Sequence, residues 1–370
     1  MKVLQVPPYA PPMRGGSEIY AFTLSKQLKE QGHYVEIFCA HWPRWTKKID
    51  NIDGIPVWRF MTTMYMLDVN PLSFFWQYVY KRVGEFDILH AHSYIYFLVN
   101  QVAAVRFVKR FPFILHLHGG LGFLPSSAFG PLNTIFKTGY DKTVGPITVR
   151  RADKVIACSE SDKRLAIKEL WADPDKIVVI PNAIEESQFY YREPEKPIVT
   201  FIGRLTTMKG ADQFPTIIRR VTKCIPNVQF NIIGEGMLEE GLKQTLKNYD
   251  VKFFGSIPHE RIPKILAKSS MLMLPTRMEG MPLVVLEAMA SGKPCVVYDV
   301  GGVAEIVQDD ITGFCPKVGR VGEFSDRIIQ IIENESLRRL LGRNGRKLID
   351  LKHTWKANAD AVMKVYKQFV

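Results

Sequence analysis

Residues 271–298 read MLMLPTRMEGMPLVVLEAMASGKPCVVY: an apolar run, a polar turn, a longer apolar segment and a second short apolar run. We expect strands at residues 271–274 and 295–298, because short apolar runs bounded by turn residues are typical of buried strands. Between them we expect a helix at residues 283–291, with Pro282 in its first turn, where a missing N–H is tolerated. Such a β-α-β unit predicts a parallel sheet covered by helices.

The same alternation extends outward along the chain. Further strands are expected at residues 3–6, 35–40, 88–90, 113–116, 155–157, 177–180, 198–201, 228–233 and 251–254, and helices at 17–31, 72–83, 94–109 and 159–170. About eleven strands are too many for one comfortable sheet, and the polar segment 185–196 separates two strand–helix series. We therefore predict an α/β protein with two Rossmann-like doubly wound domains, residues 1–186 and 187–370, whose last helix can return to the N-terminal domain.

Composition excludes some classes of function. The 370 residues are 46% hydrophobic and 23% charged, the balance of a soluble globular protein, with a formal net charge of +12. A basic excess suits anionic partners such as nucleotide phosphates, nucleic acid or a membrane surface, or it is a solvated face with no partner. No nucleic-acid-binding pattern occurs in the sequence, so we expect no nucleic-acid partner.

The sequence also indicates a compartment. The longest apolar stretch, residues 95–108, is interrupted by polar residues and falls short of the ~20 residues that span a bilayer. The first residues lack the apolar region of a secretory signal. Five widely spaced cysteines without a CxxC pair are typical of reduced thiols. We expect a cytoplasmic protein, and a location at the inner face of the membrane is compatible with this expectation.

The strongest chemical motif is the acid pair in MEGMPLVVLEAMASGKP. Glu279 would lie in the loop before the helix and Glu287 inside it, eight residues later. Backbone N–H groups around Met281 and Leu283 would form the positive end of the helix dipole. Two acids beside a helix N-terminus can hold several hydroxyl groups while the backbone holds phosphate or sugar oxygens; the alternative is one buried acid and one capping acid.

Two other turns can hold an anion. GRLTTMKG, residues 203–210, follows a strand, and its Arg204 and Lys209 can together neutralise a diphosphate without a metal. Gly15 and Gly16 precede Ser17, a good helix cap, in a strand-to-helix turn suited to anions. The alternatives are two solvated cations and an ordinary glycine turn. IIGEGM, residues 232–237, is only a weak dinucleotide signal, because Glu239 stands at the third glycine position.

No metal site is predicted. His90 and His92 in HAHS are two residues apart on an expected strand, and we expect strand alternation to turn one to each face. Asp173 and Asp175 have DxD spacing but no partner acids. We expect no cofactor and a metal-independent reaction.

Taken together, GRLTTMKG, EGMPLVVLE, SGKP and DVGGVAEIV resemble the donor domain of retaining glycosyltransferases of family GT4, which have the GT-B fold. GGSE at residues 15–18 and LHG at residues 117–119 resemble the acceptor-side elements of that family. The resemblance implies two domains facing a central cleft, a nucleotide-diphosphate-sugar donor and transfer with retention. It also implies that a β-phosphate oxygen acts as base, without a covalent intermediate.

The resemblance also implies roles for individual residues. The catalytic residues would be His118, Arg204, Lys209 and Glu279. The donor would be bound by Gly15, Gly16, Arg204, Lys209, Gly280, Met281, Pro282, Leu283 and Glu287. Arg204 and Lys209 would hold the diphosphate, Glu287 the ribose and Glu279 the transferred sugar, with FFGSIP at residues 253–258 near the base. His116 stands where the family often has a small polar residue, so either His116 or His118 faces the sugar. Ala183 and Glu185 depart from the family pattern and receive no role.

Other functions stay open beside this one. They are a non-catalytic sugar-nucleotide-binding subunit of a polysaccharide assembly, and a GT-B-like epimerase or phosphorylase. The acceptor is expected to be a sugar or a lipid-linked saccharide, with peripheral membrane contact through the aromatic segment 60–82 and the apolar loop 119–131. The alternative is that the aromatic residues form the core of a helix packed on the sheet.

Overall fold

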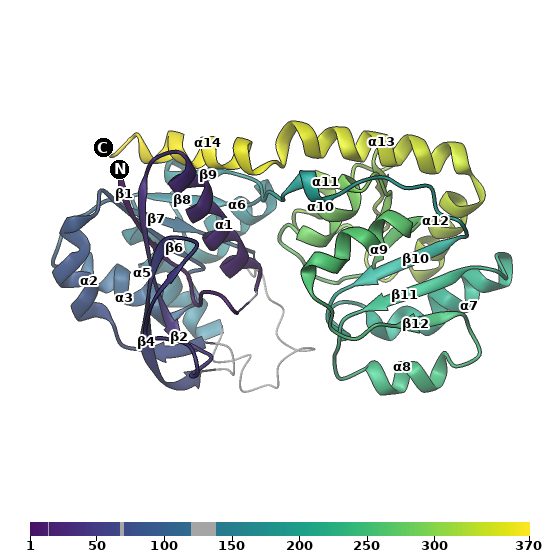
Figure 1. Ribbon diagram of the computed structural model, residues 1–370, viewed down its shortest axis with the longest axis horizontal. Coiled ribbons are helices and arrows are strands. Elements are labelled where there is room, and N and C mark those ends of the chain that lie inside the picture. The colour runs from purple at the N-terminus through teal and green to yellow at the C-terminus, as the bar shows by residue number, and fades with distance from the viewer. Residues whose placement is uncertain (14, 67–69, 120–137) are drawn as a thin grey trace. The chain divides into compact units, whose positions relative to one another are not determined.

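The computed structural model describes residues 1–13, 15–66, 70–119 and 138–370. The chain forms two compact units, Met1–Asn182 with Trp355–Val370, and Ala183–Thr354. The expected boundary after residue 186 lies four residues later than the division between Asn182 and Ala183. Each unit is an α/β structure built on its own sheet (Figure 1).

The described part of the first unit has a nine-stranded sheet in the order β3-β4-β2-β1-β6-β7-β8-β9, with β5 paired to β4. Its strands are β1 Lys2–Val6, β2 Tyr34–His41, β3 Ile49–Ile52, β4 Ile55–Met66, β5 Asn70–Ser73, β6 Ile88–His92, β7 Phe113–His116, β8 Lys154–Ala157 and β9 Ile177–Val179. Its helices are α1 Gly16–Glu30, α2 Trp76–Arg82, α3 Phe97–Val105, α5 Val144–Arg151, α6 Glu160–Leu170 and α14 Trp355–Tyr366, with short 3-10 turns η1 Val83–Glu85 and η2 Pro174–Lys176. All pairs are parallel except β3–β4 and β4–β5.

The last helix, α14, belongs to the first unit. It packs on α1, and the hydroxyl of Tyr20 on α1 donates to Oδ1 of Asn358 at 2.7 Å. Tyr366, near its end, is fully buried. A buried aromatic ring and a buried hydrogen bond fix the C-terminal helix beside the first strands.

Residues 49–73 differ from the sequence-based prediction. The structure has three strands there, β3, β4 and β5, and the helix expected from residue 72 is the shorter α2. The apolar pattern of strand β4 is interrupted by Arg59, which is only 4% exposed and lies among the apolar residues of the strand. The guanidinium of Arg59 donates to Pro11 and Lys47 carbonyl oxygens at 2.7 and 2.8 Å and contacts Asp50 at 3.1 Å. These partners compensate the burial of its charge.

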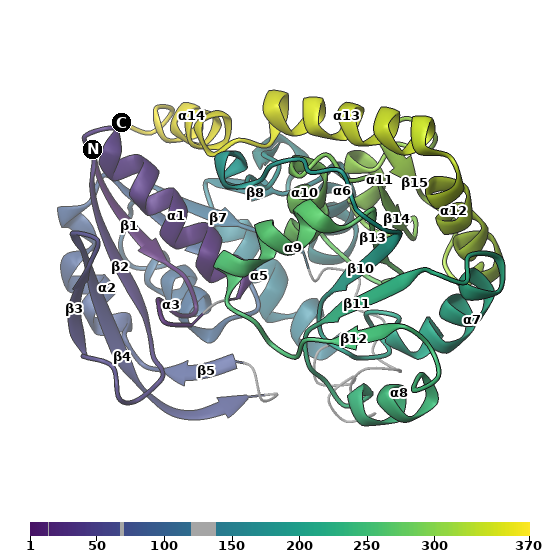
Figure 2. The same cartoon turned by 45° about the vertical axis from the view of Figure 1, so that its right-hand side comes forward.

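The second unit has a parallel sheet in the order β12-β11-β10-β13-β14-β15. Its strands are β10 Ile198–Ile202, β11 Gln229–Ile233, β12 Val251–Phe253, β13 Met271–Leu274, β14 Cys295–Val297 and β15 Gly313–Phe314. Its helices are α7 Phe214–Cys224, α8 Glu239–Thr245, α9 Ile262–Lys268, α10 Leu283–Ala290, α11 Val303–Ile306, α12 Val321–Glu333 and α13 Glu335–Lys352, with 3-10 turns η3 Glu186–Gln188, η4 Ala211–Gln213 and η5 His259–Arg261. Figure 2 shows this sheet with α7 and α8 beside β10, β11 and β12.

Both sheets have the doubly wound strand order. In the second unit the first strand, β10, is central, and the order reverses between β10 and β13. In the first unit the order reverses between β1 and β6. Ligands of open α/β sheets bind at the carboxyl ends of the strands at this switch point. The prediction of two Rossmann-like, doubly wound parts is confirmed.

Candidate active site

The loop after β10 carries the two predicted cations, and a glycine fixes its position. Gly210 adopts φ +74°, and a side chain there would overlap the carbonyl oxygen of Pro275, which follows β13. Glycine is therefore required both for the left-handed backbone and for the close approach. This contact holds the loop with Arg204 and Lys209 against the loop after β13, at the switch point of the sheet.

Arg277 ties the same two loops together. Its guanidinium donates to both carboxylate oxygens of Asp212 at 2.7 Å and to the carbonyl oxygen of Thr207. Its backbone N–H donates to the carbonyl oxygen of Met208 at 2.9 Å. The ion pair with Asp212 raises the pKa of Arg277. This pair could not be predicted from local sequence patterns, because the two residues are 65 positions apart and meet only through the pairing of β10 with β13.

The side chain predicted to bind the diphosphate, Lys209, contacts the one predicted to bind the sugar, Glu279. The ammonium group of Lys209 forms an ion pair with Oε1 of Glu279, and their side chains are 23% and 11% exposed. The backbone of Glu279 lies close to Gly301, at φ +55°, where a side chain would overlap the Glu279 carbonyl oxygen. The loops after β10, β13 and β14 are thus packed together around this ion pair.

Arg204, by contrast, is exposed. Within the part of the chain that the structure describes, its guanidinium makes no hydrogen bond and no ion pair. A guanidinium with five free donors can accept a phosphate group without first losing a protein partner. Of the two predicted cations, Arg204 has no partner among the described residues, and Lys209 is paired with Glu279.

Helix α10 begins where the sequence analysis expected. Its N-cap is Pro282, which has no N–H and makes no side-chain capping hydrogen bond. The backbone N–H groups of Leu283 and Val284 have no partner inside the helix, whereas that of Val285 donates to the carbonyl oxygen of Pro282 at 3.2 Å. This end of the helix carries the positive end of its dipole. The loop that contains Gly280 and Met281 precedes this end of the helix directly.

Glu287 is 7% exposed, and its Oε1 lies 2.7 Å from Nε2 of His259. His259 begins η5, directly after the 253–258 segment that was expected near the base. No role was predicted for His259, because a histidine after a proline carries no local signal. The contact holds a buried acid in place with a side chain that is 42% exposed.

In the first unit, His118 is half-buried and lies at the end of a hydrogen-bonded chain. The amide oxygen of Gln5 is 2.7 Å from Nε2 of His92, which therefore carries the proton. Nδ1 of His92 is 2.9 Å from Nε2 of His118, so His118 donates and keeps its lone pair on Nδ1. Burial lowers the pKa of both histidines, so both rings are neutral at pH 7.

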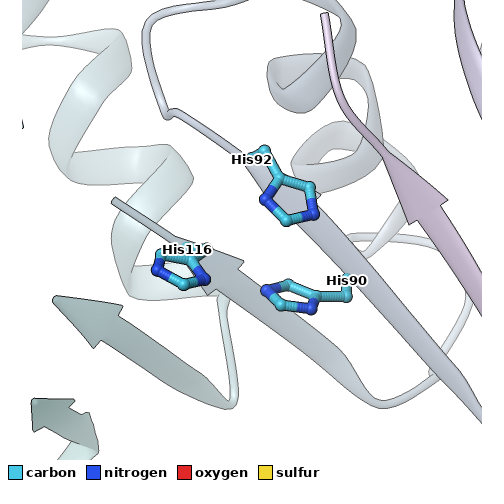
Figure 3. A group of neighbouring side chains, drawn as sticks. All are labelled: His90, His92 and His116. Atoms are coloured by element: carbon cyan, nitrogen blue, oxygen red, sulfur yellow. The ribbon is translucent and has the colours of Figure 1, made fainter. Parts of the chain in front are cut away.

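His116 and His90 correct one expectation. His90 and His92 lie on the same face of β6, with ring centroids 4.5 Å apart, because side chains two positions apart on a strand share a face. The expectation of one histidine on each face was wrong. His116, on β7, is fully buried, and its ring lies 5.5 Å from His90 and 5.8 Å from His92 (Figure 3).

The glycine turn before α1 contains an acidic side chain that was not expected there. Gly15 is the N-cap and α1 begins at Gly16, so Ser17 is not the cap. A side chain at Gly15 would overlap the carboxylate of Glu18, and the Ser17 hydroxyl donates to that carboxylate at 3.0 Å. Burial raises the pKa of Glu18. An acid thus lies over the turn that was expected to approach phosphate.

Comparison with known proteins places these features in a family. Residues 14–188 match the family described as Glycosyltransferase Family 4, and residues 183–348 match the family described as Glycosyl transferases group 1. An uncharacterized glycosyltransferase of Methanocaldococcus jannaschii is 26% identical over 375 residues, which cover 100% of this chain and 98% of that protein. The UDP-Gal:alpha-D-GlcNAc-diphosphoundecaprenol alpha-1,3-galactosyltransferase of Escherichia coli is 26% identical over 290 residues, 74% of this chain and 73% of that protein.

A solved structure has the same fold. Anabaena HepE in complex with UDP superposes with a TM-score of 0.79 at 21% identity and covers 100% of both chains. The same protein has been solved with UDP-glucose. With the family matches in both halves and the doubly wound sheet of each unit, these likenesses identify the architecture as GT-B. The chain is a glycosyltransferase and belongs to the family 4 glycosyltransferases of the GT-B fold.

Proposed function

We propose that this enzyme transfers a sugar from a nucleoside diphosphate sugar to an acceptor with retention of configuration and without a metal. The observation that carries the proposal is the set of groups at the switch point of the second sheet. Two cations, two acids and an uncapped helix N-terminus all belong to the loops and the helix at this edge. Cations suit the diphosphate, acids suit ribose and sugar hydroxyls, and backbone N–H groups suit phosphate or sugar oxygens.

Each of these groups has one role in the proposal. Arg204 and Lys209 bind the diphosphate and stabilise the charge that develops on the leaving nucleoside diphosphate. Glu287, fixed by His259, binds the ribose. Glu279 binds hydroxyls of the transferred sugar, assisted by backbone groups of Gly280–Leu283. His118 contacts the transferred sugar, and Gly15 and Gly16 approach the donor phosphates, as the family resemblance implies.

The ion pair between Lys209 and Glu279 links donor binding to sugar binding. Lys209 has three N–H donors, so it can contact a phosphate oxygen while it remains paired with Glu279. A carboxylate held this way has a fixed orientation before the sugar arrives, which is the preorganisation that catalysis requires. The acceptor hydroxyl then attacks from the face of the leaving group, and its proton passes to a β-phosphate oxygen.

A binding and turnover screen tests the proposal. Purified protein is mixed with UDP-, GDP- and ADP-sugars, and thermal shift and release of nucleoside diphosphate are measured. We expect one base to stabilise the protein and its sugar to be hydrolysed slowly without acceptor. The double variant R204A/E287A should lose both responses, and R219A, an exposed arginine on α7, should keep them. Absence of stabilisation and of turnover with every donor would contradict the proposal.

We also propose a lipid-linked acceptor, which requires contact with a membrane surface. The Escherichia coli relative has a diphosphoundecaprenol acceptor in its name. The structure divides the aromatic segment 60–82: Phe75 and Val79 are buried in the core, whereas other large side chains of this unit are exposed. The exposed aromatic residues of the segment include Phe74 at 60%, Trp76 at 48%, Tyr78 at 49% and Tyr80 at 46%, and outside the segment Phe107 is 56% and Val108 74% exposed.

Basic groups accompany these exposed rings. Lys109 lies 5.4 Å from the ring centre of Tyr80, and Arg151 lies 3.4 Å from that of Phe107. Rings for the headgroup boundary and cations for anionic lipid are what an interfacial surface needs. Only Gly119 of the apolar loop 119–131 lies within the described residues. No helix in the described parts of the chain has the length and apolar character needed to cross a membrane.

Sedimentation with vesicles tests this contact. Wild-type protein should sediment with anionic vesicles at low salt, less at high salt, and not with neutral vesicles. F107S/V108S should weaken sedimentation, and L351S, an exposed apolar residue of α13, should leave it unchanged. Wild-type protein that stays in solution with both kinds of vesicle, while it glycosylates soluble sugars efficiently, would contradict the membrane contact.

A further inference from the structure

Three histidines lie together inside the first unit. His90 and His92 come from β6, and His116 comes from β7, where it pairs in register with His92. All three side chains are 0% exposed, and one ring nitrogen from each lies within 4.8 Å of those of the other two. Figure 3 shows the three rings gathered at the ends of these two strands.

The cluster leaves polar atoms without partners. Among the residues that the structure describes, Nε2 of His90 and both ring nitrogens of His116 are buried and make no hydrogen bond. A buried polar group without a partner costs about 1–3 kcal/mol. Apolar residues would fill the same space without that cost, so Nε2 of His90 and one of the two ring nitrogens of His116, which lie close together, indicate a ligand that the protein itself does not supply.

One ring nitrogen of His90 and one of His92 have partners outside the cluster. Nδ1 of His90 lies 2.6 Å from the hydroxyl of Tyr366, and Nε2 of His92 lies 2.7 Å from the amide oxygen of Gln5. Histidines that bind a metal usually donate their second N–H to such an acceptor, which fixes the ring and the tautomer. In the tautomers that donate to these two oxygens, His90 offers Nε2 and His92 offers Nδ1, which accepts from His118 when no metal is bound.

The chemistry of the set selects the kind of ion. It contains only imidazoles, which suit Zn²⁺, Co²⁺, Ni²⁺ and Cu²⁺ rather than Mg²⁺ or Ca²⁺. Burial lowers the pKa of all three histidines, that of His90 to about 3, so the rings are in the neutral form that binds a metal. Zn–N bonds of ~2.0–2.1 Å require nitrogens roughly 3.3 Å apart in a tetrahedral site. Binding therefore requires the rings to close in by up to roughly 1.5 Å.

We propose that His90, His92 and His116 form a three-histidine site for a first-row transition metal ion of the zinc type, with water in the fourth position. The three ligands are not among the residues proposed to bind the donor, and the inference does not rest on the proposed function. It has one consequence for His118, whose Nε2 lies 2.9 Å from Nδ1 of His92. The metal takes the lone pair that accepts this hydrogen bond, so metal binding releases His118 from its anchor.

The test is a titration of the full-length protein with Co²⁺ after dialysis against a chelator. We expect saturation at one equivalent with the visible absorption of a tetrahedral Co²⁺ site, and displacement by Zn²⁺. H116N should weaken Co²⁺ binding by at least 100-fold, and Q5L, which removes an outer hydrogen bond, by about 10–100-fold. H33A, a histidine outside the cluster that faces the N-terminal amine, should bind as wild type.

Circular dichroism and thermal melting of each variant separate loss of the site from loss of the fold. If H116N does not fold, the comparison of Q5L with wild type decides. Wild-type protein that takes up no Co²⁺ at micromolar concentration would overturn the proposal. So would folded H116N, or folded Q5L, that binds as tightly as wild type, or binding that H33A abolishes.

Discussion

Lys209 and Glu279 form an ion pair although 70 residues separate them in sequence and the family resemblance gives them different parts of the donor. The pair joins the loop after β10 to the loop after β13 at the point where the strand order of the second sheet reverses. Each partner restricts the other before any ligand binds. The cation for the phosphate and the acid for the sugar therefore act as one unit, whereas Arg204 stays open.

The first prediction concerns the two cations. R204A and K209A should each lose on the order of 2–4 kcal/mol of transition-state stabilisation, mostly in kcat, because they act on charge that develops in the leaving group. K209A should also weaken use of the sugar, since it frees Glu279. Steady-state kinetics at saturating donor measures this, with R219A as the control. Wild-type turnover in both R204A and K209A would show that this loop is not the phosphate site.

A second prediction separates the two acids. E287A should weaken binding of the free nucleoside diphosphate, because its partner is the ribose. E279A should leave that binding nearly unchanged and reduce sugar transfer. H259A should resemble a milder E287A, since it removes the 2.7 Å contact that orients the acid. Isothermal titration calorimetry with the nucleotide gives the comparison, and equal weakening in E279A and E287A would refute the assignment.

A third prediction concerns Arg277. R277A removes the bidentate contact with Asp212 and the hydrogen bond to Thr207, so the cation loop loses its attachment to the loop after β13. We expect kcat/KM to fall at least about tenfold, because small displacements of the groups that position the substrate strongly reduce the reaction rate. Arg220 and Asp326 supply the matched control, an exposed bidentate pair with distances of 2.9 Å. R220A should keep its activity, and a similar loss in both variants would indicate a general effect on stability.

The fourth prediction is that EDTA leaves most of the transferase activity intact, because fixed cations carry the charge of the diphosphate. Added Zn²⁺ should inhibit if His118 acts in catalysis, since metal binding at His92 removes the hydrogen-bond partner of His118. Activity assays with EDTA alone, with Mg²⁺ or Mn²⁺ and with Zn²⁺ make the comparison. Complete loss in EDTA that Mg²⁺ or Mn²⁺ restores would contradict the prediction.

The fifth prediction is a loss of stability in acid. Burial lowers the pKa of His90 to about 3 in the folded protein, and those of His92 and His116 also lie well below the ~6.5 of an exposed histidine. Below pH 6.5 the unfolded chain takes up protons that the folded chain does not, so stability is full above that pH and falls as the pH falls. Each histidine contributes a slope of up to about 1.4 kcal/mol per pH unit.

Urea unfolding between pH 7.5 and 5 measures this slope. H116N removes one of the three groups, so its free energy of unfolding should fall less steeply with decreasing pH than that of the wild type. An unfolding free energy of the wild type that is flat from pH 7.5 to 5 would show that the histidines are not held neutral.

Local patterns were sufficient to predict much of the fold. The strands β10 to β14 and the helix α10 follow from short apolar runs and from Pro282, and they place Arg204, Lys209, Glu279 and Glu287 at one edge of a sheet. Strand β4 was missed because the buried Arg59 interrupts its apolar pattern, and its compensation comes from residues up to 48 positions away.

Contacts between distant loops could not be predicted in the same way. The pairs Arg277–Asp212 and His259–Glu287 exist because particular strands are neighbours. Strand order cannot be predicted from local sequence patterns. The histidine cluster was not predicted for a different reason. His90 and His92 were expected on opposite faces of the strand, although residues two positions apart on a strand lie on the same face. His116 then adds the third ring only because β7 pairs with β6.

Retention and donor use can be observed in one measurement. The donor sugar that produces nucleoside diphosphate in the screen is incubated with enzyme and acceptor, and the anomeric proton of the new glycoside is followed by NMR as it forms. We predict that the first product detected has the anomeric configuration of the donor, that no metal is needed, and that R204A/E287A makes none. A first product of inverted configuration would contradict the account, as would transfer by R204A/E287A at the wild-type rate.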